Sequence, residues 1–135
     1  MKKTRKYCLA ALFAAVALIL FVVEAQFPSL TPVPGIKPGF SNIVTVFSLY
    51  SLGPVFTLGV LLCRILLGAF VTGQVSALLF SLAGGLLAFL LCALLQRWLP
   101  PKQLWVCSVL GALAHNLGQL LMAIAVTATP ALLAY

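Results

Sequence analysis

Residues 74–95 have the sequence QVSALLFSLAGGLLAFLLCALL, which contains no charged side chain. At 1.5 Å per residue in a helix, a segment of this length crosses the roughly 30 Å hydrocarbon core of a bilayer. It is followed by Gln96, Arg97 and Trp98, and basic and aromatic residues are typical of the membrane interface. The segment therefore predicts a transmembrane helix.

The whole chain shares the composition of this segment. Of its 135 residues, 64% are hydrophobic and 7% are charged, and its mean hydropathy is +1.22, whereas soluble proteins carry roughly 25% charged residues. The length allows about five or six crossings of roughly 20 residues each. We expect residues 1–135 to form a single integral membrane domain, an all-α polytopic membrane helical bundle with five to six transmembrane helices, embedded in the lipid bilayer of the cell membrane.

The charged residues exclude several classes of function. The chain has eight Lys and Arg residues but a single acid, Glu24, and four of the eight basic residues lie in the first six positions. Nucleic-acid binding needs basic residues clustered on a solvated surface, and magnesium-dependent prenyl or phosphoryl transfer needs several carboxylates. The chain also contains no P-loop and no G-x-S-x-G motif. We therefore expect no catalytic residues and no cofactor.

The cysteines predict no metal site. They stand singly in apolar runs, without a C-x-x-C pair and without a neighbouring His or carboxylate, at Cys8, Cys63, Cys92 and Cys107. Metal ligation would need several thiolates at one point. We expect them to be small apolar residues in the core or against lipid.

The first span is expected at residues 7–25, after the basic sequence MKKTRK. A cleaved signal peptide has a similar pattern, but this apolar run is longer than usual and further membrane helices follow, so we expect it to be retained. The next residues, 26–39, contain four prolines and two glycines, which exclude a helix. Non-helical backbone at membrane depth needs protein or a watery cavity beside it, so this loop is a candidate wall of a binding site.

Further spans are predicted at residues 41–52, 54–70 and 104–127. Gly53-Pro54 divides the apolar run from 40 to 70. Two separate spans there place the loop that contains Arg97 and Lys102 on the same side as the basic N-terminus. Because Lys and Arg concentrate in cytoplasmic loops, we expect a cytoplasmic N-terminus. The 41–52 span is too short to cross unaided, and residues 130–135 resemble the start of a sixth helix.

Small residues four apart mark faces where helices can approach closely. Ser81 with Gly85 and Ala114 with Gly118 are such pairs, and packing within the protein accounts for them. The alanine face of the first span is the best candidate for binding a partner protein; it consists of Ala10, Ala11, Ala14 and Ala15.

Polar side chains inside a membrane are costly and usually face a cavity or a partner. Arg64 lies well inside the 54–70 span, where it can extend toward the interface, pair with Glu24, bind helix-end carbonyls or bind an anionic ligand. His115, Asn116 and Gln119 lie within two turns of the 104–127 span, with His115 and Gln119 on one face. They predict a polar ligand pocket, and interhelical hydrogen bonding is the alternative.

Two residues near the proline-rich loop are candidates for the same site. Lys37 offers a cation, and Asn42, with Thr45, follows the loop; a role for Ser41-Asn42 as a helix N-cap is the alternative.

Four ordered motifs resemble the Gx transporter family, whose members are often labelled heptaprenyl diphosphate synthase component I. These are PGIKPGFSNIVT at 34–45, RILLG at 64–68, SLAGG at 81–85 and AHNLGQL at 114–120. That family is similar to the substrate-binding S-components of energy-coupling factor (ECF) transporters. The resemblance implies six helices, a capping loop matched by residues 26–40, and an alanine-rich face on the first helix that docks on a coupling subunit.

The resemblance and the polar residues together indicate a membrane-embedded subunit that binds a small molecule, either vitamin-like or a prenyl or other anionic compound. Its candidate substrate-binding residues are Lys37, Asn42, Arg64, His115, Asn116 and Gln119, and its expected partners are ECF coupling and ATPase subunits. The alternative is a non-catalytic membrane accessory subunit of heptaprenyl diphosphate synthase in menaquinone side-chain synthesis. The chain has no aspartate, so it cannot supply the aspartate-rich magnesium motifs of prenyl synthases.

Overall fold

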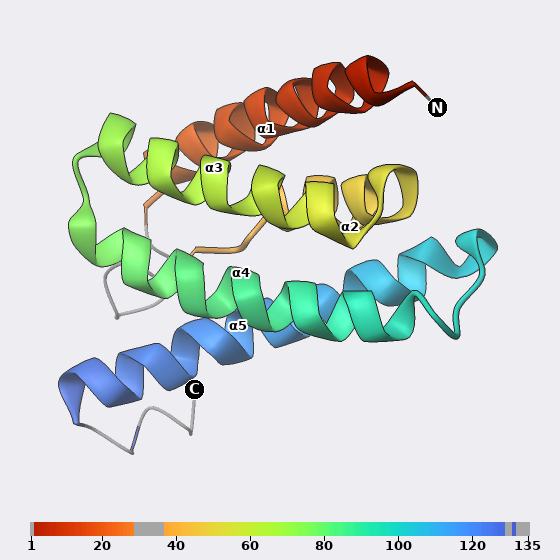
Figure 1. Cartoon of the computed structure of the whole chain (residues 1–135). Helices are drawn as coiled ribbons and strands as arrows, with labels where there is room; N and C mark the ends of the chain where they lie inside the picture. Colours follow the sequence, from red (N-terminus) through yellow and green to blue (C-terminus); the bar gives the residue numbers. More distant parts are fainter. Residues whose placement is uncertain (1, 29–36, 129–130, 132–135) are drawn as a thin grey trace.

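The computed structural model describes residues 2–28, 37–128 and 131, and within them the fold is all-helical (Figure 1). The helices are α1 (Lys3–Gln26), α2 (Ser41–Leu52), α3 (Pro54–Thr72), α4 (Val75–Leu95) and α5 (Leu104–Thr127), with a 3-10 turn η1 (Pro101–Gln103) before α5. These helices occupy the ranges in which the sequence predicted spans. Apart from Ala131, the expected start of a sixth helix lies outside the described residues, as does most of the proline-rich loop.

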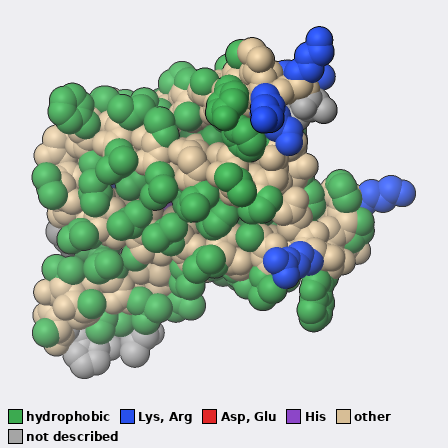
Figure 2. All heavy atoms as spheres, in the orientation of Figure 1, with side chains coloured by type: hydrophobic (Ala, Val, Ile, Leu, Met, Phe, Trp, Pro, Cys, Tyr) green, Lys and Arg blue, Asp and Glu red, His purple; other side chains and the backbone are tan. Residues whose placement is uncertain are grey.

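The helices have the length and composition of a multi-pass membrane protein. Four candidate spans, α1, α3, α4 and the continuous segment Pro101–Thr127, are long and apolar enough to cross a bilayer, and α2 is a shorter apolar helix. Large apolar side chains are exposed along the outside of the bundle, for example Phe70 at 87% and Val55 at 80%, and hydrophobic side chains are spread over the face in Figure 2. In a bilayer these side chains contact lipid.

The short helix α2 has one face packed into the bundle, whereas Ile43 and Phe47 on its other face are 56% and 53% exposed. It contacts α1, α3, α4 and α5, and most of its 12 residues are buried. Gly53, with a φ of 85°, ends it, and Pro54 begins α3. The division into two helices at Gly53-Pro54 is therefore confirmed. Because the other helices pack against its buried face, α2 is held in place although it is shorter than the candidate spans.

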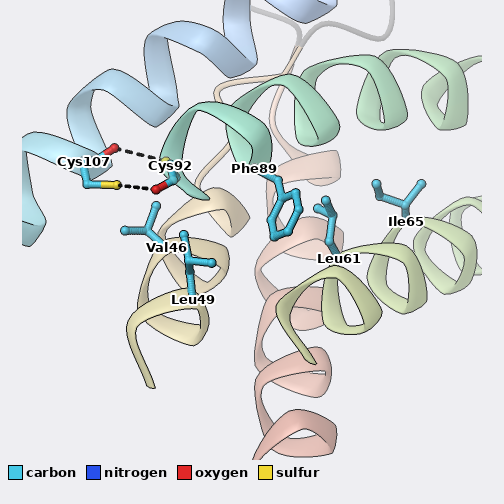
Figure 3. Close-up of a cluster of buried hydrophobic side chains, with 7 residues drawn as sticks. All are labelled: Val46, Leu49, Leu61, Ile65, Phe89, Cys92 and Cys107. Carbon is cyan, nitrogen blue, oxygen red and sulfur yellow. Dashed lines mark hydrogen bonds between the residues drawn. The ribbon is translucent and has the colours of Figure 1, made fainter. Parts of the chain in front are cut away.

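The apolar core joins four helices (Figure 3). Its buried members are Val46 and Leu49 from α2, Leu61 and Ile65 from α3, Phe89 and Cys92 from α4, and Cys107 from α5. Cys92 Sγ donates to the Cys107 carbonyl at 3.4 Å, and Cys107 Sγ donates to the Cys92 carbonyl at 3.9 Å. Cys8 and Cys63 are exposed, so the cysteines lie in the two environments that the sequence predicted.

Glycines allow α4 and α5 to approach closely. A Cβ atom at Gly118 would lie 2.7 Å from the carbonyl oxygen of Ala83, and one at Gly84 would lie 2.7 Å from that of His115. Such short separations leave no room for a side chain. The predicted small pair Ala114 and Gly118 therefore contributes to packing inside the protein.

The basic residues gather at one end of the bundle. In Figure 1 the N-terminus and the α4–α5 connection lie at the same end, and Figure 2 shows Lys and Arg side chains there. The exposed members of this group are Lys2, Lys3, Arg5, Arg97 and Lys102. By the positive-inside rule we expect this end to face the cytoplasm, and this orientation stays a prediction.

Candidate ligand-binding site

Helix α2 begins in the middle of the bundle rather than at its surface. Just before it, Gly39 lies against His115 near the midpoint of α5, where an added Cβ would be 2.7 Å from His115 Cδ2. At its first residue, Ser41 Oγ accepts a hydrogen bond from Nη1 of Arg64, near the midpoint of α3. The irregular backbone before α2 thus enters the core, where each N–H group needs a partner.

Glu24 and Gln119 supply those partners. Glu24 Oε1 accepts hydrogen bonds from the N–H groups of Gly39 and, at 3.2 Å, Phe40, and Gln119 Oε1 accepts one from Lys37 N at 3.4 Å. A carboxylate at this position also interacts favourably with the positive end of the helix dipole. Both side chains are buried, so they hold the start of α2 in place from α1 and α5.

The open question of an Arg64–Glu24 pair is answered by these contacts. Within the described residues no hydrogen bond joins the two side chains, because Glu24 binds backbone N–H groups and Arg64 binds Ser41. The single carboxylate therefore has a structural role that its sequence position alone did not indicate.

Arg64 is the most unusual residue of the site. It is 2% exposed, and its Nε and Nη2 atoms have no hydrogen-bond partner among the described residues. Leaving a buried charge without partners is costly, and buried charges in proteins are normally paired. Two of the three guanidinium nitrogens are therefore buried without a hydrogen-bond partner in the described residues.

His115 and Gln119 lie on the inner face of α5, as predicted, and are 3% and 1% exposed. The His115 ring lies between two glycines, since it contacts the Cβ positions of both Gly39 and Gly84. Its Nδ1 atom has no partner in the described part of the chain. The sequence could not show this, because the glycines that flank the ring come from distant segments.

Lys37 and Asn42 approach the same region from the connection and from α2. The ammonium group of Lys37 lies 4.4 Å from the centre of the Phe21 ring and has no hydrogen-bond partner among the described residues. Burial lowers the pKa of Lys37 below its usual value, and the negative charge of Glu24 opposes this shift. Asn42 is buried, with Nδ2 3.2 Å from the position of a Cβ at Gly111.

The structure does not bring Asn116 into this group. Its side chain is exposed, whereas those of His115 and Gln119 are buried. Successive residues of a helix point about 100° apart, so the neighbour of an inward-facing histidine can turn toward lipid. Conversely, Ser41, which the sequence suggested only as a cap, accepts the hydrogen bond from Arg64, and buried Thr45 has an Oγ1 atom without a partner in the described residues.

The alanine face of α1 divides into two strips. Ala11 and Ala15 are exposed, whereas Ala10 and Ala14 are half-buried. The exposed strip is accessible to another membrane protein, and its partner-binding role stays a prediction. Among the described residues no group of His, Cys, Asp or Glu side chains could hold a metal ion.

The fold and the site define a multi-pass membrane protein whose helical bundle encloses a polar, cationic centre. A family model described as heptaprenyl diphosphate synthase component I matches residues 13–135, a range that includes every candidate substrate-binding residue. The chain therefore belongs to the heptaprenyl diphosphate synthase component I family. Searches of curated proteins and of solved structures found no match.

Proposed function

We propose that this protein is the membrane-embedded substrate-binding subunit of a small-molecule transporter of the ECF type. The observation that carries the proposal is the buried Arg64, whose Nε and Nη2 lack partners in the described residues, beside a short helix that begins inside the bundle. Membrane transporters often bind substrates at discontinuous helices whose N-termini lie near the midplane. A bundle that served only as a scaffold would gain nothing from such a costly centre.

In this proposal the substrate binds among five side chains from four segments of the chain. Arg64 and Lys37 provide positive charge, and the remaining three provide hydrogen-bonding groups: Asn42, His115 and Gln119. Since α1 runs from the basic end toward the opposite end of the bundle (Figure 1), the proposal has the substrate enter from the non-cytoplasmic side. Energy comes from separate coupling and ATPase subunits, with the exposed strip of Ala11 and Ala15 as the docking surface.

A second candidate function is supported by the family description. A protein labelled as component I of heptaprenyl diphosphate synthase would be a non-catalytic membrane subunit that assists a separate catalytic subunit. The sequence is consistent with that role because it contains one acid and no aspartate, whereas metal-dependent prenyl transfer needs several carboxylates.

Gentle extraction and co-purification distinguish the two functions. Recovery of an ATPase together with a transmembrane coupling subunit supports the transporter, and recovery of an aspartate-rich prenyl synthase supports the accessory subunit. Ala11→Leu and Ala15→Leu should reduce recovery of the coupling subunit, while Ala125→Leu, at an exposed alanine of α5, should leave it unchanged. Recovery of neither set of partners from native membranes would contradict both functions.

A further inference from the structure

The two unpartnered nitrogens of Arg64 lie on the same edge of its guanidinium group. Nη1 is occupied by Ser41 Oγ, and Nε and Nη2 have no partner in the described chain. The Nε–Nη2 edge presents two parallel N–H groups, which is the geometry that binds both oxygens of a carboxylate or phosphate. A buried arginine with only a structural role would be expected to use this edge.

Nδ1 of His115 lies near the same part of α4 as Nη2 of Arg64. Nη2 of Arg64 lies 3.5 Å from the Cβ position of Gly85, and Nδ1 of His115 lies 3.1 Å from that of Gly84. Neither nitrogen has a hydrogen-bond partner among the described residues. Unpartnered groups from α3 and α5 therefore both lie against one turn of α4, which is closely packed on those sides.

The charges around the start of α2 leave one positive charge without compensation. The charged groups there are Arg64, which is always protonated, Lys37 and Glu24. The carboxylate of Glu24 is already bound by the N–H groups of Gly39 and Phe40. One further negative charge would balance the site, whereas a diphosphate would bring an excess.

We propose that the Nε–Nη2 edge of Arg64 binds a singly charged anionic group with two oxygens, either a carboxylate or a phosphodiester. This inference rests on the proposed binding function and narrows its ligand class. It favours a monoanionic substrate headgroup over a prenyl diphosphate. Arg64 sets the specificity because a lysine at this position would keep the charge but lose the paired donors.

The test measures the thermal unfolding midpoint of the full-length protein in phosphatidylcholine nanodiscs with four small probes. Butyrate carries the carboxylate, dimethyl phosphate carries the phosphodiester, butyramide is the neutral analogue of butyrate, and pyrophosphate is the polyanion. A bound probe at about ten times its dissociation constant should raise the midpoint by roughly 3–6 °C. The variants are Arg64→Gln and Arg64→Lys, with Arg97→Gln, an exposed arginine, as the matched control.

We expect butyrate or dimethyl phosphate to stabilise the wild type and Arg97→Gln. A larger shift of the midpoint with butyrate identifies the natural ligand as an organic acid, and a larger shift with dimethyl phosphate identifies it as a lipid-like phosphodiester. The shift should vanish in Arg64→Gln and require at least a tenfold higher concentration in Arg64→Lys. Equal stabilisation by butyramide, a larger shift with pyrophosphate, or no shift with either monoanion would overturn the inference. If the Arg64 variants fail to fold, the comparison of butyrate with butyramide on the wild type still tests whether binding requires the negative charge of the probe. Co-purification tests the transporter separately, so either idea can fail alone.

Discussion

At the scale of single residues, Arg64 and Glu24 have opposite charges but do not pair with each other, and each has a different role. Glu24 completes the backbone hydrogen bonds at the start of α2, while Arg64 retains an edge without partners in the described residues. A direct ion pair would have satisfied both groups and left nothing for a ligand. In the proposed site, the separation of the two charges is what leaves this edge available to an anion.

Replacing Glu24 tests its structural role. Glu24→Ala leaves the N–H groups of Gly39 and Phe40 without their acceptor inside the bundle, so we expect the free energy of unfolding to fall by about 2–4 kcal/mol. Glu24→Gln keeps one acceptor oxygen and should cost about half as much. Chemical unfolding in nanodiscs measures both, with Gln26→Ala, an exposed residue of the same helix, as the control. Equal stability of Glu24→Ala and Gln26→Ala would refute this role.

Lys37 should make stability depend on pH in the alkaline range. Its pKa in the folded protein is lowered from 10.5, chiefly by burial, so between the lowered pKa and 10.5 the unfolded chain binds more protons than the folded one. Stability then rises with pH in this interval. We expect the wild type to gain stability relative to Lys37→Gln as the pH rises toward 10.5, the usual pKa of lysine. A constant difference across this interval would show that burial does not perturb Lys37.

The sequence identified most of the site residues but not how they are used. Arg64, His115 and Gln119 were noticeable because charged and hydrogen-bonding side chains are rare in membrane helices. Their inward orientation depends on packing, as the contrast between buried His115 and exposed Asn116 shows. The contacts of Glu24 with Gly39 and Phe40 could not be predicted, since they join segments that the proline-rich loop separates.

At the scale of elements, the bundle depends on two devices, the break before α3 and the close contact of α4 with α5. Both were visible in the sequence, as Gly53-Pro54 and as small residues spaced by four. What the sequence did not reveal is that one face of α2 is buried against the other four helices. The sequence indicated only that the 41–52 segment is too short to cross a membrane unaided.

Two glycine-to-alanine changes test the α4–α5 contact. Gly118→Ala places a Cβ 2.7 Å from the Ala83 carbonyl oxygen, and we expect it to lower the free energy of unfolding by about 1–3 kcal/mol. Gly59→Ala, in α3, meets no atom within 4 Å and should raise it by up to about 1 kcal/mol, because alanine favours helix more than glycine does. If both substitutions change the free energy of unfolding in the same direction in denaturant titrations, the close contact between α4 and α5 is not present in the membrane.

At the scale of the whole molecule, the proposed function requires that the basic end faces the cytoplasm and that the substrate enters from the other side. The arrangement in Figure 1 places the α3–α4 turn at the end opposite the N-terminus. Exposed Lys and Arg gather at the N-terminal end (Figure 2). The same orientation would let a partner on the cytoplasmic side contact α1.

Cysteine labelling tests this orientation. In a background with Cys8 and Cys63 replaced by serine, Gln74→Cys should react with a membrane-impermeant maleimide in intact cells. Lys102→Cys should react only after permeabilisation, because it lies at the basic end. Both positions are exposed in the structure, so accessibility is not limited by burial. The reverse pattern would invert the topology and place the binding site on the cytoplasmic side.

The central claim is that a buried cationic site around Arg64 holds an anionic ligand inside a membrane bundle. Native mass spectrometry of the wild type and of Arg64→Gln, both released from their own membranes under gentle conditions, tests it most directly. The account predicts a bound small molecule with a single negative charge on the wild type and its loss from Arg64→Gln at unchanged folding. A wild-type protein released without any ligand, or a ligand retained equally by Arg64→Gln, would contradict the claim.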